Sequence, residues 1–223
     1  IEGIDATGNL VQGNFIGTDV SGTYAIGNCY YGGVAIYFAP GNTIGGTTAG
    51  AGNLISGNDG SGVYIEGLDA VGNVLQGNLI GTDVTGTQTL SNFDGVDVFY
   101  APGTVIGGTE PGARNTISAN DGYGIYITGN ESAGTVVQGN YIGTDVTGTV
   151  ALGNFYDGVL IDNAPDTLIG GATPGAGNVI SANGLFGAPG ISIYYSPGTI
   201  VQGNLIGTDA TGINPLGNSY EGI

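Results

Sequence analysis

The sequence predicts an all-β fold, a single-stranded parallel β-solenoid of about seven coils with about 32 residues in each. Two observations predict it: three columns of residues recur with a common period, and glycines keep register with them. Apolar residues at i and i+2 place both side chains on one face of a strand. The Gly-Asn, Gly-Gly and Gly-Thr pairs that close each run permit a sharp corner. Such short strands cannot stand alone, so each is expected to pair in parallel with its copy one repeat away.

The first column is a short strand with the pattern Gly-[Val/Ile]-x-[Ile/Val]. Because its two aliphatic side chains share a face, both are expected in the core. The opening residues are Val34, Val63, Val96, Ile125, Val159 and Ile191, and the second aliphatics are Ile36, Ile65, Val98, Ile127, Ile161 and Ile193.

The second column is a single aliphatic residue two positions before a glycine, and it sets the period. It lies in two alternating motifs, QGNxIGTD, which begins at Gln12, Gln76, Gln138 and Gln202, and IGGTxxGAxN. A division of each long repeat into three coils of about 21 residues is the alternative. The even steps of about 31 to 33 residues favour two coils and a rod about 34 Å long. The column is Val11, Ile44, Leu75, Ile106, Val137, Ile169 and Val201.

The third column consists of asparagine. Asparagine tolerates left-handed backbone, and stacked side-chain amides can hydrogen-bond along a rod, so a structural ladder is expected. Its members are Asn28, Asn58, Asn92, Asn120, Asn154, Asn183 and Asn218.

Two segments resemble a known class. Residues 53–65 and their near copy 115–127 resemble the parallel β-helix repeat of bacterial secreted and surface proteins. The companion segment, residues 137–154, is similar to the tandem form found in long extracellular proteins. The resemblance implies a right-handed solenoid with three short parallel sheets and an asparagine column at one turn. It also implies an extracellular or cell-surface location, but this architecture serves enzymes, adhesins and passive scaffolds alike.

Composition excludes several functions. The 223 residues include 48 glycines, 18 acidic residues, one basic residue, one cysteine and no histidine, which gives a net charge of −17. Binding to nucleic acid through phosphate contacts is excluded because Arg114 is the only cation. Imidazole catalysis and disulfide or two-cysteine zinc sites are excluded as well. Insertion into a membrane is not expected, since no run of 18 apolar residues exists.

Catalysis has little support in the sequence. Arg114, the one candidate base for a lyase, stands where the equivalent loops have Gly52 and Gly177, so it is interpreted as a turn residue. One aspartate recurs in every IGTD motif, and an Asx-type turn explains it better than calcium, which needs six to eight oxygens. No coil carries a unique acidic cluster, so neither an enzyme nor a cofactor is expected. The recurring residues are Asp19, Asp83, Asp145 and Asp209.

Aromatic residues gather after the first-column strand and at its outward position. They could form an exposed stripe for stacking sugars or for contact between rods. The alternative is that half of each adjacent pair belongs to the core. The residues are Tyr37, Phe38, Tyr64, Phe99, Tyr100, Tyr126, Tyr194 and Tyr195.

Residues 1–223 are expected to form one solenoid domain. The chain begins and ends inside the first-column strand, with no capping element at either end, so a piece of a longer array is favoured over a fibre of stacked chains. The expected partners are adjacent repeats or other copies, together with glycans. The expected function is a non-catalytic structural solenoid, as a fibre, stalk or adhesin segment. The alternative is a carbohydrate-binding or carbohydrate-active module, such as a polysaccharide lyase or hydrolase.

Overall fold

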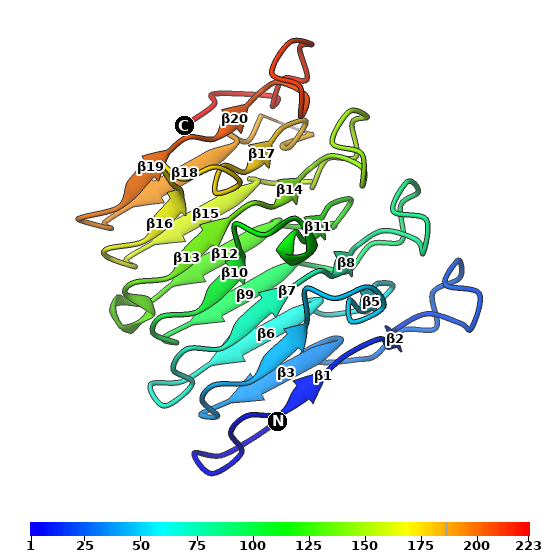
Figure 1. Ribbon diagram of the computed structural model, residues 1–223, viewed down its shortest axis with the longest axis vertical. Helices are drawn as coiled ribbons and strands as arrows, with labels where there is room; N and C mark the ends of the chain where they lie inside the picture. Colours follow the sequence, from blue (N-terminus) through cyan, green and yellow to red (C-terminus); the bar gives the residue numbers. More distant parts are fainter. Residues whose placement is uncertain (186) are drawn as a thin grey trace.

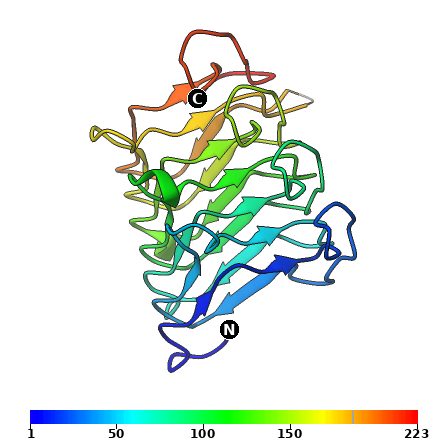
Figure 2. The same cartoon turned by 45° about the vertical axis from the view of Figure 1, so that its right-hand side comes forward.

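The computed structural model describes residues 1–185 and 187–223, and it is a parallel β-solenoid (Figures 1 and 2). The chain winds through three parallel sheets, and each strand pairs with its copies in the neighbouring turns. The first sheet contains β1 (Leu10–Val11), β4 (Thr43–Gly45), β7 (Val74–Gln76), β10 (Val105–Gly107), β13 (Val136–Gln138), β16 (Leu168–Gly170) and β19 (Ile200–Gln202). The second contains β2 (Phe15–Ile16), β5 (Leu54–Ile55), β8 (Leu79–Ile80), β11 (Thr116–Ile117), β14 (Tyr141–Ile142), β17 (Val179–Ile180) and β20 (Leu205–Ile206). The third contains β3 (Val34–Tyr37), β6 (Val63–Glu66), β9 (Val96–Phe99), β12 (Ile125–Thr128), β15 (Val159–Asp162) and β18 (Ile191–Tyr194).

The coil length predicted from the second column is confirmed. Val11 pairs with Ile44 and Ile44 with Leu75, and the same register continues to Val201, which excludes the alternative of three shorter coils per long repeat. The third sheet has six strands, so the described chain completes six turns rather than about seven.

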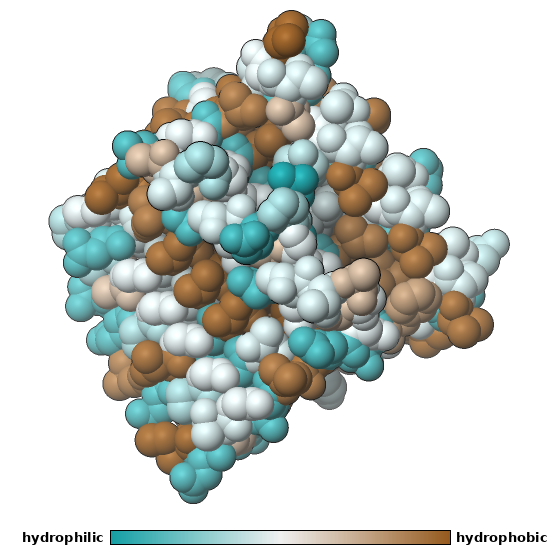
Figure 3. Space-filling view, viewed as in Figure 1, coloured by the Kyte–Doolittle hydropathy of each residue, from teal (hydrophilic) through white to brown (hydrophobic). Residues whose placement is uncertain are grey.

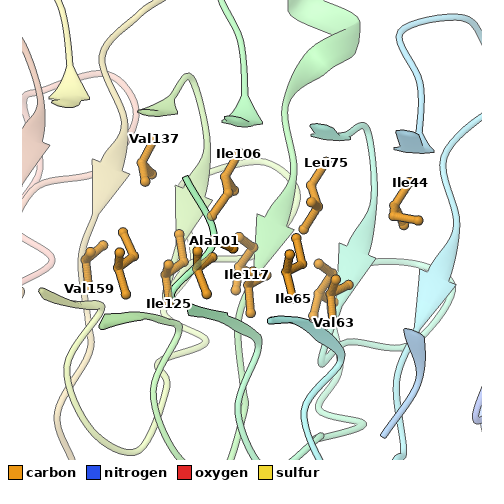
Figure 4. Packing of buried hydrophobic residues seen from close by; sticks show 14 of the residues in the cluster. Ile44, Val63, Ile65, Leu75, Ala101, Ile106, Ile117, Ile125, Val137 and Val159 are labelled. Atoms are coloured by element: carbon orange, nitrogen blue, oxygen red, sulfur yellow. The ribbon is translucent and has the colours of Figure 1, made fainter. Parts of the chain in front are cut away.

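The core is a column of aliphatic side chains enclosed by the three sheets. Figure 4 shows them directed toward one another from facing strands. Side chains of the first and second columns are fully buried in the inner turns, as at Ile65 and Ile106. Ile193 departs from the pattern: it is 37 % exposed because it lies on β18, at the edge of the third sheet.

The second sheet contributes a core column that the sequence analysis did not identify. It consists of Ile16, Ile55, Ile80, Ile117, Ile142, Ile180 and Ile206, which pair in sequence along the rod. Its spacing alternates, with 39 residues from Ile16 to Ile55 and 25 from Ile55 to Ile80. In one kind of turn the long loop comes before the second-sheet strand, as between β4 and β5. In the next kind it comes after that strand, as between β2 and β3. The turn length therefore stays even while the spacing of this column alternates.

Some apolar side chains remain outside the core. Figure 3 shows them scattered among polar residues over the face of the molecule that Figure 1 presents. Val20 and Ile213, for example, are exposed in loops that follow strands of the second sheet. Scattered exposure of this kind is ordinary in folded proteins and marks no site by itself.

Glycine is needed where neighbouring turns come close. At Gly107, φ is +88° and an added Cβ would overlap the carbonyl oxygen of Gln138 in the next turn. Gly45 and Gly170 occupy the same position and face the same kind of contact. These glycines therefore permit the sharp corner, and they also allow the strands of neighbouring turns to approach to hydrogen-bonding distance.

Regular helix is almost absent from the described residues, which contain two single-turn 3₁₀ segments, η1 (Pro111–Ala113) and η2 (Asn130–Ser132). No helix in the described part of the chain is long and apolar enough to cross a membrane.

Candidate functional site

The predicted asparagine column forms a continuous ladder. In each step the side-chain amide of one asparagine donates to the side-chain oxygen of the next, as from Asn92 to Asn120 at 3.1 Å and from Asn120 to Asn154 at 2.9 Å. A second ladder, which was not predicted from the sequence, runs through Asn14, Asn53, Asn78, Asn115, Asn140, Asn178 and Asn204. Its signal was present in the QGN motif and in the last position of IGGTxxGAxN.

The recurring aspartates lie in loops that protrude after the second sheet (Figure 1). The carboxylate of Asp83 accepts from the Thr85 hydroxyl at 2.7 Å and from the backbone amides of Thr87 and Gln88 at 3.2 and 3.1 Å. Asp145 and Asp209 close their loops in the same way. Burial opposes the ionisation of Asp83, but these hydrogen bonds outweigh it and lower the pKa of the carboxyl. The carboxylates are thus occupied within their own turns.

We expect Asp83→Ala to open its loop without unfolding the rod. The change removes charge-assisted hydrogen bonds, so unfolding free energy should fall by about 1–2 kcal/mol. Hydrogen exchange at the Thr87 and Gln88 amides should accelerate. Asp59→Ala, at an exposed aspartate outside these loops, is the control. Unchanged exchange in Asp83→Ala would contradict the turn role.

The single cation does not act on an acidic partner. The Arg114 guanidinium lies 4.1 Å from the centroid of the Tyr141 ring, and its Nε donates to the carbonyl of Gly139 at 3.2 Å. Its backbone is extended, with φ −61° and ψ 123°, so an arginine fits this turn without strain.

Eight rings form a connected chain on the outward face of the third sheet and the turn before it, with neighbouring centroids 5.1 to 5.7 Å apart. We call this the aromatic stripe. Its rings are half-buried or exposed, so none belongs to the core. The stripe consists of Tyr31, Tyr37, Tyr64, Phe99, Tyr123, Tyr126, Phe155 and Tyr156.

Four of the eight predicted aromatic residues belong to the stripe: Tyr37, Tyr64, Phe99 and Tyr126. The alternative that half of each adjacent pair is core is wrong: Tyr37 and Phe99 are half-buried, and Phe38 and Tyr100 are exposed. Phe38, Tyr100 and Tyr195 begin the corner after the strand, with φ of 52°, 54° and 48°, and turn away from the sheet face. Tyr194 is exposed at the end of β18.

The other four stripe residues, Tyr31, Tyr123, Phe155 and Tyr156, were not predicted from the sequence. Tyr123 lies two residues before Ile125, and Tyr31 and Tyr156 lie three before Val34 and Val159. The signal was an aromatic residue just ahead of the Gly-[Val/Ile] pair, where the chain turns into the strand.

A unique pair of acidic residues lies beside the stripe, contrary to the expectation that no coil carries one. Asp97 takes the outward position on β9 between Tyr64 and Tyr126, and Asp94 lies just before the same strand. Asp97 is 4 % exposed and Asp94 7 %. The Ser61 hydroxyl donates to Oδ2 of Asp97, and the Tyr123 amide donates to Asp94 at 2.6 Å. Among the described residues, Oδ1 of Asp97 has no hydrogen-bond partner.

Burial controls the protonation of this pair. Burial, and then the charge of Asp94, raise the pKa of Asp97 to about 8. Burial raises the pKa of Asp94 to about 6, against the opposing hydrogen bond from the Tyr123 amide. Near neutral pH the pair therefore retains a proton.

A related arrangement occurs farther along the sheet. The Ser192 hydroxyl donates to Asp157, and burial raises the pKa of that carboxyl. In both places a serine donates to an aspartate in an adjacent turn, but only the first has a second aspartate beside it. In the described part of the chain, no three acidic, histidine or cysteine side chains gather to hold a metal ion.

The geometry is thus an outward face of aromatic rings with carboxyl groups set among them. The chain matches no protein-family model, no curated protein and no solved structure. The fold itself is a three-sheet parallel solenoid.

Proposed function

We propose that this chain is a rigid, non-catalytic segment of an extracellular or cell-surface protein, and that its aromatic stripe binds neutral saccharides. The observation that carries the proposal is the stripe itself: rings from successive turns form one connected surface on a single sheet face. Membership of the bacterial β-helix repeat proteins is part of this proposal.

The ring spacing supports a polymeric ligand. Sugar rings stack their apolar faces on aromatic side chains, and a polymer contacts several rings at once. In the stripe, parallel strand pairing holds successive turns about 4.8 Å apart. The surface therefore needs little ordering when a ligand binds, which favours affinity.

Charge supports a neutral ligand. The only cation of the chain, Arg114, is stacked on Tyr141 away from the stripe, and the net charge is −17. Such a surface repels polyanions such as uronic acid polymers.

The rigidity of the segment follows from the repeated ladders, which hydrogen-bond each turn to the next. Its one arginine also leaves trypsin-like proteases a single site of cleavage, which suits a protein exposed outside the cell.

A second candidate function is hydrolysis of a neutral glycan, and the Asp94–Asp97 pair favours it. A protonated carboxyl beside a second carboxyl is the pairing that glycosidases use. The burial of Asp97 weighs against this function, because its free oxygen is closed off from solvent.

The test is an array of neutral and acidic oligosaccharides, probed with the wild type and with Tyr126→Ala. We expect binding to neutral glycans only. Tyr126→Ala should weaken the glycan affinity by about 5- to 100-fold, the loss typical when an aromatic side chain that stacks on one nucleic-acid base is removed. Tyr31→Ala, at the exposed end of the stripe, is a second variant that should disturb folding less because Tyr31 is exposed. Tyr24→Ala, in a loop outside the stripe, is the matched control.

Absence of binding to every neutral glycan would overturn the proposal. Release of reducing ends by the wild type, abolished in Asp94→Asn, would instead establish hydrolysis.

A further inference from the structure

A row of left-handed residues follows the strands of the third sheet. The chain turns a corner there, and φ is positive in every turn: 110° at Gly67 and 94° at Gly129, but 52° at Phe38 and 54° at Tyr100. Glycine takes this conformation at no steric cost, whereas an aromatic residue is strained in it. Two alternate turns thus carry bulky rings where the intervening turns carry glycine.

Each ring lies over the glycine of the next turn. A Cβ added to Gly67 would overlap the Phe38 ring, and one added to Gly129 would overlap the Tyr100 ring. Since Phe38 and Tyr100 are two turns apart, their backbones are separated by roughly 9.6 Å along the rod. Neither ring is fully covered: Phe38 is 46 % exposed and Tyr100 47 %.

These two rings border a notch of about 280 Å³. Its floor is the turn Glu66–Leu68, and Glu131 from η2 completes the wall. Glu66 accepts a hydrogen bond from the Tyr64 hydroxyl at 2.9 Å, so its second oxygen is free for a ligand in the described structure. The notch therefore combines aromatic surface with two carboxylates, and no lining residue is a cation.

We propose that this notch binds a small organic ammonium group, such as a trimethylammonium head. Aromatic faces attract cations, and they prefer weakly hydrated organic cations because these shed water easily. Two carboxylates supply the matching charge, and the net charge of −17 attracts cations at a distance. Calcium fits poorly, because it needs six to eight oxygens and the lining side chains offer those of two glutamates.

This inference goes beyond saccharide binding and does not depend on it. The notch lies at the corner of the turn, and its rings, Phe38 and Tyr100, make none of the ring contacts that define the aromatic stripe.

The repeat itself supplies variants that should fold. Phe38→Gly and Tyr100→Gly install the residue that the intervening turns already carry, so the corner keeps its conformation. Tyr195→Gly is the matched control, because Tyr195 occupies the same left-handed position, with φ of 48°, but does not line the notch.

The experiment titrates the protein with choline chloride at constant ionic strength and follows the amide signals of Leu68 and Glu131 by NMR. The neutral isostere 3,3-dimethylbutan-1-ol is titrated in parallel. We expect saturable shifts with choline alone, and affinity about 2- to 5-fold weaker in each ring variant. Glu131→Gln should also weaken binding, and Tyr195→Gly should not.

Three results would overturn the proposal. Equal amide shifts with the alcohol would show apolar contact alone, and equal amide shifts with added sodium chloride would show general screening of the protein's charge. The third is a choline affinity that stays unchanged in folded Phe38→Gly and Tyr100→Gly. A saccharide array that fails would leave this result untouched, so the two proposals can be rejected separately.

Discussion

Asn115→Ala should cause the largest loss of stability of any single substitution considered for this chain. Asn115 is fully buried, and its side chain makes four hydrogen bonds: it donates to Leu75 and Asn140 and accepts two from Asn78. Alanine leaves the Asn78 backbone amide and one hydrogen of the Asn78 side-chain amide without their acceptor inside the rod. Since each such group costs roughly 1–3 kcal/mol, we expect a loss of about 3–5 kcal/mol. Urea denaturation followed by circular dichroism measures it.

Asn14→Ala is the matched control at the exposed end of the same ladder. Its side chain donates to Gln12 and Asn53, and its backbone amide keeps a bond to Asn53 in the variant. The expected loss is below about 1.5 kcal/mol. Equal losses in the two variants would show that the ladder contributes no cooperative stability.

Asp97→Asn should remove most of the pH dependence of stability above pH 6. The pKa of Asp97 rises on folding from 3.8 to about 8, first through burial and then through the charge of Asp94. An acid that holds its proton more tightly when folded contributes full stability below pH 4, and that contribution is lost as pH rises toward about 8. The wild type should therefore weaken steadily over this range. Asparagine carries no charge, and its oxygen can still accept from Ser61.

The measurement is the urea midpoint between pH 4 and pH 8.5. In Asp97→Asn the remaining decline should end near pH 6, where Asp94 titrates, and the variant should exceed the wild type in stability at pH 8. Asp162→Asn, at a half-buried aspartate on β15 of the same face, should keep the wild-type slope. If Asp97→Asn keeps that slope as well, the pair does not hold the proton.

Even spacing along the chain explains which core columns could be predicted. The first-sheet column recurs at nearly equal steps and each member carries the same flanking glycine, so its pairing followed from arithmetic alone. The second-sheet isoleucines bury equally well, but alternating loop lengths break their period. A column of this kind becomes visible only when the turns are stacked.

The site shows a similar division. Tyr64 and Tyr126 were identified because outward positions follow from strand alternation. Asp94 and Asp97 look like ordinary surface residues in a chain with many carboxylates. They become a distinct pair only in the folded chain, where both side chains are buried and Asp97 lies between Tyr64 and Tyr126 of the adjacent turns.

The sequence by itself determined the repeat, the parallel strands and the positions of the corners, because those depend on residues close together in the chain and on one period. It also excluded phosphate contacts and imidazole chemistry, since the needed side chains are absent. Only the tertiary structure decided which aromatic side chains share a face and which turn outward at a left-handed corner. It also decided which carboxyls lose their solvent, because burial and ring contact depend on adjacent turns whose residues lie far apart in the sequence.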